Sequence, residues 1–473
     1  MSESQVIEAV RAPAGTAPPG VFRPLLQALA AAQVRHALLR DDPLALDAVR
    51  DLDLLVHPKD VTATFTVLDE AGFRLKRDRR LRRKWVFVRY RDGRFDVVDL
   101  HGACVQNGLE YMDAALAIER AEPTAGIPCL AREDAFLHLL LHNLIGKRHL
   151  QAKHLDRLLE LQAIGIDPAR LRLQTARFGL DGIVATARDE FATLAQDTDA
   201  CRTLRTAACR VLWRRPANIW GGLCYRWGDR LRVQRRPVVL ALLGPDGSGK
   251  TSFADALQAH LDDSPLQPGR VYMGSWGHDL LPMRQARRLV PPQVSHTRLL
   301  LRRLGMPAAV STEEEAALVE RPNPARLLAA AIRYALKGAG FHTAIAVEMT
   351  YRYARHIARS RRPVVISDRW VHDLEFRQGK IPFVHGQRPR GLWYRLFPAP
   401  DAILYLTTPY DLVEKRKPQL DRRQFETMDA VFRTILAPQH PLLLVSDAPP
   451  EAMVRAFLTQ HWERILERCN RRA

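Results

Sequence analysis

Residues 238 to 253 read VVLALLGPDGSGKTSF. An apolar run rich in branched side chains ends at Gly244, and a helical pattern resumes after Thr251. The spacing G-x-x-x-x-G-K-T between them is that of a P-loop, with the strand before it and the helix after it that this motif needs. Its glycines let backbone N–H groups turn toward a polyphosphate, and the helix N-terminus adds its dipole. The stretch predicts a nucleotide-binding loop.

The predicted cofactors of this loop are ATP and Mg²⁺. We expect the Lys250 ammonium to reach the β and γ phosphates and the Thr251 hydroxyl to ligate Mg²⁺. The expected cofactor-binding residues are the loop and the first turn of its helix: Gly244, Asp246, Gly247, Ser248, Gly249, Lys250, Thr251 and Ser252.

Length and composition indicate a globular protein of several domains. The chain has 473 residues, 47% of them hydrophobic, which suggests two to four domains with ordinary packed cores. The net charge of +19 fits nucleic acid, an anionic membrane or a polyanionic substrate without choosing among them. Arginine far outnumbers lysine and alanine is abundant, a bias that a GC-rich genome produces by itself. We therefore do not expect nucleic acid as the partner.

Cysteine usage and the terminal sequence predict a cytoplasmic protein. The six cysteines show no C-x-x-C pair and no zinc spacing with histidine, so we expect reduced thiols. The first 20 residues lack the apolar core of a signal peptide, and no run approaches the 18 apolar residues of a membrane span.

Composition shifts along the chain predict five segments. Residues 1–20 are rich in Ala, Pro and Gly and read as a disordered tail. Residues 21–125 mix strand and helix patterns, and residues 126–200 are helical. Residues 201–236 combine tryptophans with many arginines and form a linker, whose peripheral contact with an anionic membrane stays open. Residues 237–473 carry the P-loop and form the last domain.

Strand and helix patterns alternate from Val238 onward, which predicts a parallel sheet with helices on both faces. Ligands of such a sheet bind beyond the carboxyl ends of its strands. Polar motifs do follow the predicted strands: Asp368-Arg369-Trp370 follows residues 363–367, Thr407-Thr408-Pro409 follows 402–406, and Ser446-Asp447-Ala448 follows 442–445.

These ordered motifs, with Asp246 inside the P-loop and an Arg-rich stretch at 414–426, resemble the thymidylate kinase family over residues 237–468. The resemblance implies that Asp368 and Arg369 face the acceptor and that Arg416 closes over the phosphates. With Lys250, these three are the expected catalytic residues. Residues 274–340 depart from a compact thymidylate kinase, so the acceptor stays open, and Arg352 is the candidate contact for an acceptor phosphate.

The N-terminal segment carries a pair of acids on a predicted strand. Asp51 and Asp53, in DLDLLV, are two residues apart and point to one face. Close carboxylates are costly without a cation, and Mg²⁺ bridging nucleotide phosphates supplies one. A third carboxylate comes from FDVVDLH, where Asp96 and Asp99 lie on opposite faces, so that only one contributes.

Residues 22–165 resemble uncharacterised bacterial nucleotidyltransferase-like domains, through the D-x-D-L-L-V strand, Gly72-Phe73 and Asp99-Leu100-His101. The resemblance implies an α+β domain with a metal site at Asp51, Asp53 and Asp99. The Gly-Gly or Gly-Ser turn that precedes the D-x-D strand in transferases of this fold is replaced here by Leu39-Arg40-Asp41-Asp42. Whether the domain is catalytic or only recognises substrate stays open.

We therefore predict an ATP-dependent small-molecule kinase fused to a nucleotidyltransferase-like module. The acceptor is a nucleoside monophosphate, a sugar or a sugar phosphate, and the two chemistries suggest nucleotide-sugar or polysaccharide metabolism. The alternative is a nucleotide-dependent binding or regulatory protein that holds nucleic acid or membrane through its arginines. The sequence leaves open whether the chain forms a homodimer.

Overall fold

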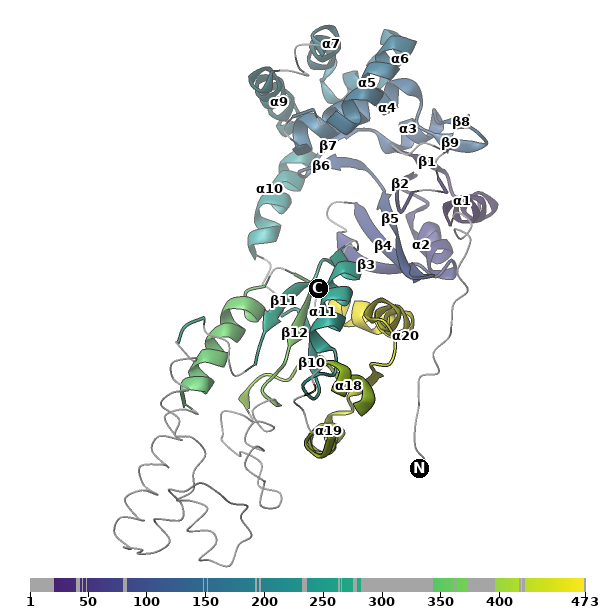
Figure 1. The fold of residues 1–473 in the computed structure, drawn as a ribbon. Helices are drawn as coiled ribbons and strands as arrows, with labels where there is room; N and C mark the ends of the chain where they lie inside the picture. Colours follow the sequence, from purple (N-terminus) through teal and green to yellow (C-terminus); the bar gives the residue numbers. More distant parts are fainter. Residues whose placement is uncertain are drawn as a thin grey trace, which may run out of the picture. The chain divides into compact units, whose positions relative to one another are not determined.

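A computed structural model of the chain describes the following residues: 21–39, 43–44, 46–47, 49–79, 83–147, 149–150, 152–191, 194, 197–231, 236–262, 264, 266–274, 279–281, 343–360, 362–372, 396–416, 418 and 422–471. The chain divides into two compact units, drawn in Figure 1. The first ends at Val233 and also includes Thr459–Arg471, and the second runs from Gln234 to Leu458. The expected tail at 1–20 and most of the segment 274–340 lie outside the described residues.

The N-terminal unit begins with an α+β part. Its elements are α1 (Phe22–Ala31), β1 (His36–Leu38), β2 (Asp51–Val56), α2 (Val61–Glu70), β3 (Arg74–Arg79), β4 (Lys84–Arg91), β5 (Arg94–His101), β6 (Cys104–Gln106), β7 (Leu109–Met112), α3 (Ala114–Glu119), β8 (Glu122–Thr124) and β9 (Ile127–Cys129). Seven strands form one mixed sheet in the order β3-β4-β5-β2-β1-β9-β8, while β6 and β7 pair separately. Strands β2 and β5 run parallel at its centre, with Asp53 beside Asp99.

Strand β2 contributes to two cores because successive side chains point to opposite faces. Leu52 and Leu54 pack in one hydrophobic cluster with residues of α1 and α2. Leu55 packs in another cluster, with residues of the helices that follow the sheet. Asp53 lies on the Leu55 side by this alternation, so the predicted acidic face is the one toward those helices.

The hairpin predicted at Arg91-Asp92-Gly93 joins β4 to β5. The two strands pair antiparallel, with Arg91 opposite Arg94. Asp92 has φ of 53° and Gly93 has φ of 78°, as a two-residue turn of this kind requires at both central positions. The turn sets the register that brings Lys84 opposite His101 at the far end of the hairpin.

Helices complete the N-terminal unit. They are α4 (Arg132–Leu141), a π-helix (His142–Lys147), α5 (Ala152–Ile164), α6 (Pro168–Phe178), α7 (Asp181–Asp189), α9 (Thr198–Trp213) and α10 (Pro216–Leu231). Among the residues that the structure describes, no helix is long and apolar enough to cross a membrane.

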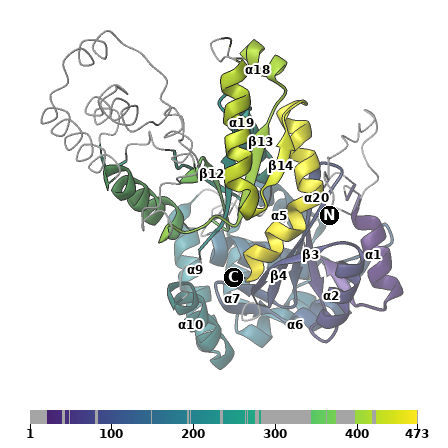
Figure 2. The same ribbon diagram turned by 90° about the horizontal axis from the view of Figure 1, so that it is seen from below.

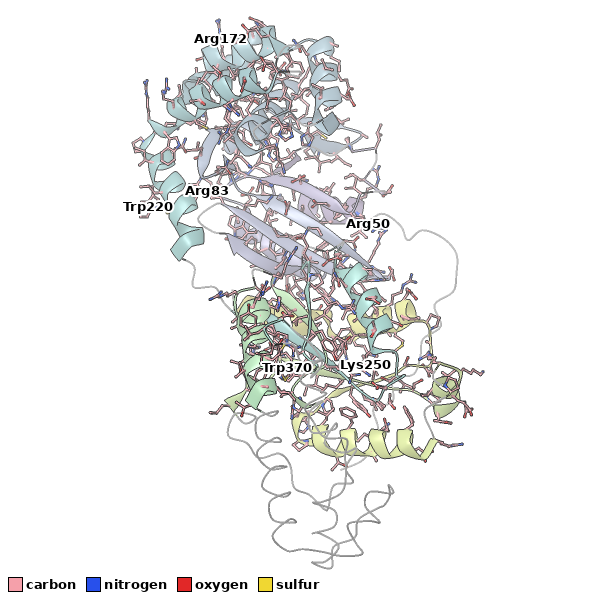
Figure 3. All side chains as sticks on the ribbon, turned by 60° about the vertical axis from the view of Figure 1, so that its left-hand side comes forward. Arg50, Arg83, Arg172, Trp220, Lys250 and Trp370 are labelled. Atoms are coloured by element: carbon pink, nitrogen blue, oxygen red, sulfur yellow. The ribbon has the colours of Figure 1, made fainter. Side chains whose placement is uncertain are left out.

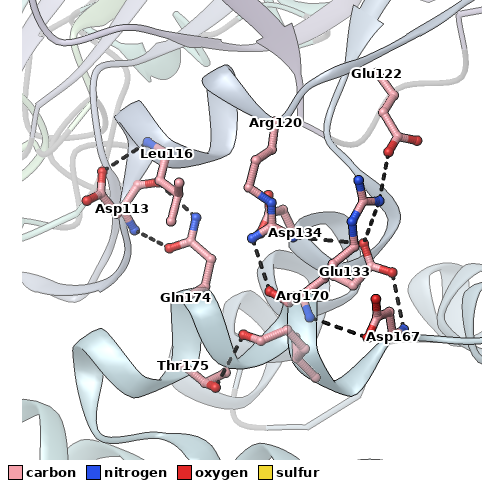
Figure 4. Close-up of polar contacts among 11 residues, drawn as sticks. Asp113, Leu116, Arg120, Glu122, Glu133, Asp134, Asp167, Arg170, Gln174 and Thr175 are labelled. Atoms are coloured by element: carbon pink, nitrogen blue, oxygen red, sulfur yellow. Dashed lines mark hydrogen bonds and ion pairs between the residues drawn. The ribbon is translucent and has the colours of Figure 1, made fainter.

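A polar network fixes α4 and α6 against the chain around α3 (Figure 4). The Asp113 carboxylate caps α3 by accepting hydrogen bonds from the backbone N–H groups of Ala115 and Leu116. Gln174 of α6 donates to the Asp113 carbonyl and accepts from its N–H. Arg120 lies 3.5 Å from the fully buried Asp134 of α4. These contacts lock the helices to the sheet-bearing part of the unit.

The C-terminal unit alternates strands and helices. Its elements are β10 (Val238–Leu243), α11 (Lys250–Asp262), β11 (Gly269–Tyr272), a helix at 343–352 that continues as a π-helix (Tyr353–Ala358), β12 (Val364–Asp368), β13 (Ala402–Thr407), α18 (Tyr410–Arg416), α19 (Arg422–Leu436), a 3₁₀ turn (Ala437–Gln439), β14 (Leu442–Val445) and the part of α20 (Pro450–Arg471) up to Leu458. Four of these strands, β10, β12, β13 and β14, lie where the sequence predicts them.

All five strands are parallel, in the order β11-β12-β10-β13-β14. The central strand β10 is buried along its whole length. Its odd-numbered residues pack with Ile345 and Met349 and with Phe432 of α19, while α11 contacts β10 and β12. Figure 2 shows α18, α19 and α20 beside this sheet. Burial on both faces explains why β10 is a continuous apolar run.

Asp134 makes the stability of the N-terminal unit depend on pH. Burial raises the pKa of Asp134 from its ordinary value of 3.8 to about 6, against the opposing effect of Arg120. The stabilising contribution of the protonated carboxyl is therefore complete below pH 3.8 and is lost as the pH rises through about 6.

Asp134→Asn removes this ionisation. The free energy of unfolding of this variant relative to the parent should rise by up to about 3 kcal/mol between about pH 3 and pH 7, measured by urea titration with fluorescence detection. The control Asp199→Asn changes an exposed carboxylate of α9 in place of the buried one. A pH-independent difference for Asp134→Asn would contradict the expectation.

Candidate functional site

A cavity of about 360 Å³ lies at the carboxyl ends of β10, β11 and β12. The loop after β10 and the first turn of α11 form one wall, which is made of Asp246, Gly247, Gly249, Lys250, Thr251 and Ser252. Gly244 and Ser248 do not line it, and Ser248 is fully buried behind the loop. The structure thus brings six of the eight loop residues expected to bind nucleotide to one cavity. The helix N-terminus at Lys250 is oriented to favour an anion there.

Lys250 is held inside the loop that precedes it. The residue is 6% exposed, and its ammonium donates hydrogen bonds to the carbonyls of Gly244 at 2.9 Å and Pro245 at 2.6 Å. Figure 3 labels its place in the unit. The ammonium also lies 3.5 Å from Ser248 Oγ, and a phosphate oxygen in the cavity would compete with these three partners for its three N–H donors.

Gly249 is required by its backbone and by its surroundings. Its φ of +84° is one that side-chain-bearing residues rarely adopt, and an added Cβ would lie 2.9 Å from Ser446 Oγ and 3.4 Å from an Arg416 nitrogen. Glycine here lets the loop pass close to the carboxyl end of β14 and to the end of α18.

Asp368 and Arg369 enter the cavity from the end of β12. Arg369 has a positive φ of 73°, which costs a non-glycine residue about 1–3 kcal/mol. Its N–H donates to the Leu242 carbonyl at 3.0 Å, and its guanidinium lies 2.6 Å from the Asp246 carboxylate. The backbone strain thus accompanies a guanidinium that is fixed against the loop, at the edge of the cavity.

Arg416 and Tyr272 complete the lining of the cavity. Arg416, the expected phosphate-binding cation, is the last residue of α18. Tyr272 was not predicted; the only sequence signal for it is its place at the end of the short run GRVY before Met273-Gly274. Of the other cations in the Arg-rich stretch 414–426, Arg422 pairs with Glu426 at 2.9 Å on α19, and Lys417 lies outside the described residues.

Arg352 does not fit the acceptor-phosphate contact predicted for it. The residue is 2% exposed, and its guanidinium donates to the carbonyls of Tyr272 at 2.7 Å and Gly274 at 3.0 Å. It also lies 3.2 Å from the buried Glu348, which accepts hydrogen bonds from the backbone at 279–281. Arg352 therefore fixes the chain after β11 and does not line the cavity.

A second candidate site lies on the helix-facing side of the N-terminal sheet. Side-chain ligand atoms of Asp53, Asp99 and His101 all lie within 4.8 Å of one another, a geometry that suits a metal ion. The parallel register of β2 and β5 creates this group, because it sets Asp53 beside Asp99 and places His101 on the same face. His101 Nε2 lies 3.5 Å from Asp53 Oδ1, and the Lys84 ammonium donates to Asp99 Oδ2.

The other predicted acids lie apart from this group. Asp51 is exposed at the start of β2 and does not belong to it. Asp96 is buried on the opposite face of β5, 3.4 Å from nitrogens of Arg89 and Arg94. Burial lowers the pKa of His101, and Lys84 also lowers it, against the neighbouring carboxylates. The imidazole is thereby kept neutral at pH 7, the form that ligates metals.

Comparison with known proteins supports the N-terminal assignment. Residues 43–176 match the family described as "Uncharacterised nucleotidyltransferase", so this domain is nucleotidyltransferase-like. Among solved structures, the chain is similar to TT1252 from Thermus thermophilus, with 15% identity and a TM-score of 0.23 over 48% of this chain and 98% of that one. The search of curated proteins gave no match.

Gly249→Ala should weaken the binding of polyphosphate in the cavity. The added methyl group meets Ser446 and the backbone is strained, so we expect a loss of about 1–3 kcal/mol in the stability of this unit. Affinity for tripolyphosphate, measured by calorimetry, should fall with it. Gly269→Ala is the matched control, since its added Cβ would meet only ordinary contacts of 3.5 Å or more. Equal affinities for Gly249→Ala and the parent would show that the loop does not need this conformation.

Proposed function

We propose that the C-terminal unit is a kinase that transfers the γ-phosphate of ATP to a small molecule. The observation that carries the proposal is the cavity at the carboxyl edge of the parallel sheet, where a glycine-containing loop and a helix N-terminus meet Lys250, Arg369 and Arg416. Phosphoryl transfer depends mainly on positioning and on positive charge around the moving group. These cations, with a Thr251 hydroxyl for Mg²⁺, supply both.

The two carboxylates of the cavity divide the remaining roles. Asp368 is placed to orient Mg²⁺ or to accept a hydroxyl proton. Asp246 holds Arg369 by their 2.6 Å contact and faces the same space. A guanidinium fixed in this way is suited to clamp an acceptor phosphate. We therefore favour an acceptor that already carries phosphate, such as a nucleoside monophosphate or a sugar phosphate, over an uncharged sugar.

The N-terminal unit suggests a second transfer step. A nucleotidyltransferase-like domain uses a nucleoside triphosphate and a divalent ion, and the group of Asp53, Asp99 and His101 offers ligands for that ion. A chain with both chemistries would phosphorylate a metabolite and then activate it as a nucleotide conjugate. We propose that these two reactions, in this order, belong to nucleotide-sugar or polysaccharide metabolism.

Lys250→Met tests the kinase proposal. Full-length protein is incubated with ATP, Mg²⁺ and a broad set of nucleotides and sugar phosphates, and products are detected by mass spectrometry. Loss of the ammonium should lower the rate of phosphate transfer by about 100-fold or more, because one donor to the transition state is removed. Lys415→Met, at an exposed position of α18 outside the cavity lining, should transfer at the parent rate.

Two results would contradict the proposal that the C-terminal unit is a kinase. One is equal turnover by Lys250→Met and the parent. The other is ATP binding with no phosphorylated product, together with nucleic-acid binding that weakens steeply with salt, which would favour the nucleotide-dependent binding protein instead.

We also propose that α10 contacts an anionic membrane surface. Ile219, Trp220 and Leu223 lie on one side of this helix and are 44%, 68% and 40% exposed; Figure 3 labels Trp220 on it. Arg210 and Arg214, on the preceding stretch, are also exposed. An exposed indole ring and aliphatic side chains, with exposed guanidinium groups nearby in the sequence, fit a bilayer interface that carries negative charge.

Trp220→Ser should weaken binding to vesicles that contain phosphatidylserine by roughly tenfold, as expected for the loss of one large buried apolar side chain. Co-sedimentation measures this. Leu173→Ser removes a comparably exposed apolar side chain from α6 and should leave vesicle binding unchanged. Equal binding of the parent to vesicles of phosphatidylcholine alone would contradict the role of charge.

A further inference from the structure

The ligand set on the N-terminal sheet differs from the one that the paired acids suggest. The sequence places Asp51 and Asp53 on one face with Asp99, a set of three carboxylates. In the structure the atoms that converge belong to Asp53, Asp99 and His101, whereas Asp51 is exposed and outside the group. An imidazole nitrogen thus takes the position that an all-oxygen site would fill with a carboxylate.

The donor atoms bear on the choice of metal. Mg²⁺ takes oxygen ligands in a near-ideal octahedron and keeps several waters, so it is usually held by carboxylates and phosphates. Imidazole suits transition ions, and two carboxylate oxygens with one imidazole nitrogen are ligands found in zinc sites. Asp53 is 6% exposed and the Asp99 and His101 side chains are 18% and 13% exposed. The three side chains are thus largely shielded from water, which does not easily replace them as ligands of a metal ion.

We propose that Asp53, Asp99 and His101 bind a divalent transition ion, of which Zn²⁺ and Mn²⁺ are examples, in preference to Mg²⁺. The proposal rests on the metal-dependent chemistry proposed for the N-terminal unit and specifies its ion. His101 is then the residue that determines metal selectivity. Its place on β5, one alternation beyond Asp99, is set by the same strand pairing that joins the two carboxylates.

Lys84 is the competitor of this ion. Its ammonium contacts Asp99 Oδ2, and it lies opposite His101 in the β4–β5 pairing. A divalent ion that binds Asp99 through this oxygen must displace the ammonium. The displaced Lys84 and the bound ion together would outweigh the two carboxylate charges, which leaves a net positive site for polyphosphate.

The experiment measures metal binding alone, with no nucleotide present. Full-length protein is freed of metal with a chelator and titrated separately with Zn²⁺, Mn²⁺ and Mg²⁺ in a calorimeter, and Asp53→Asn gives the background from other sites. The parent should bind Zn²⁺ and Mn²⁺ at the Asp53-dependent site more tightly than Mg²⁺. Transition ions bind most mixed sites more tightly than Mg²⁺, so the variants carry the decision.

His101→Asp restores an all-oxygen set and should narrow the ratio of Zn²⁺ to Mg²⁺ affinity by roughly tenfold or more, since even the loss of a supporting group around a metal costs 10- to 100-fold. His101→Asn, which adds no charge, should lower Zn²⁺ affinity by a similar factor. Lys84→Met should raise the affinity for every ion. Asp51→Asn is the matched control and should change none of them, and circular dichroism checks that each variant is folded.

The proposal is overturned if folded His101→Asp and His101→Asn keep the parent's ratio of Zn²⁺ to Mg²⁺ affinity, if Asp51→Asn weakens binding as much as Asp53→Asn, or if the parent shows no Asp53-dependent binding. Because no substrate is present, an enzyme that binds Zn²⁺ through His101 and transfers nothing would contradict the proposed function and not this inference. A Mg²⁺-selective site in an active transferase would do the reverse.

Discussion

The parallel pairing of β10 with β12 and β13 is the constraint on which the C-terminal unit depends. Parallel strands must all end at the same edge of the sheet, so each connecting segment begins there. The cavity is lined by the glycine-containing loop, Tyr272 and Asp368-Arg369. More than a hundred residues of sequence separate the loop from Asp368, yet they line one cavity because their strands end side by side. The strained backbone of Arg369 belongs to the same arrangement, since its N–H continues the β10 pairing through the Leu242 carbonyl.

Parallel strand pairing also determines the arrangement of polar groups in the N-terminal sheet. Its central strand β2 must bury leucines on both faces and still present a carboxylate. The pairing with β5 makes this tolerable, because it places the His101 imidazole 3.5 Å from Asp53 and because the Lys84 ammonium offsets the charge of the neighbouring Asp99. A buried carboxylate is costly when it is alone and acceptable when cations or neutral donors surround it. A single strand therefore supplies both a polar side chain for the candidate metal site and the leucines that pack in the cores.

Much of this follows from the sequence, for identifiable reasons. Strands β10, β12, β13 and β14 are short apolar runs because both faces of their sheet are covered, and such runs are easily read. The β4–β5 hairpin is predicted by Asp92-Gly93, whose turn needs two positive φ angles. The same alternation predicts that Asp96 and Asp99 face opposite sides, as they do. These features depend on residues close together in the chain.

The features that the sequence did not reveal depend on distant partners. Strand β3, RLKRDR, is charged because it is the edge of its sheet and has little apolar pattern to detect. Arg352 resembles a phosphate ligand until its burial and its contacts with the carbonyls of Tyr272 and Gly274 are seen. His101 belongs to the motif Asp99-Leu100-His101, but its place beside Asp53 follows only from the parallel register of β2 and β5.

That register has a consequence for how the domain can change over evolutionary time. A shift of β2 by one residue relative to β5 would turn Asp53 toward the leucine cluster of α1 and α2 and bring Leu52 or Leu54 to the polar face. Insertions in the segment before β2 can be absorbed only if they leave the strand itself in place. Relatives that lose the chemistry of this sheet should therefore do so by substitution of Asp53, Asp99 or His101 one at a time. The register of β2 and β5 should be retained in them, because the packing of the domain still requires it.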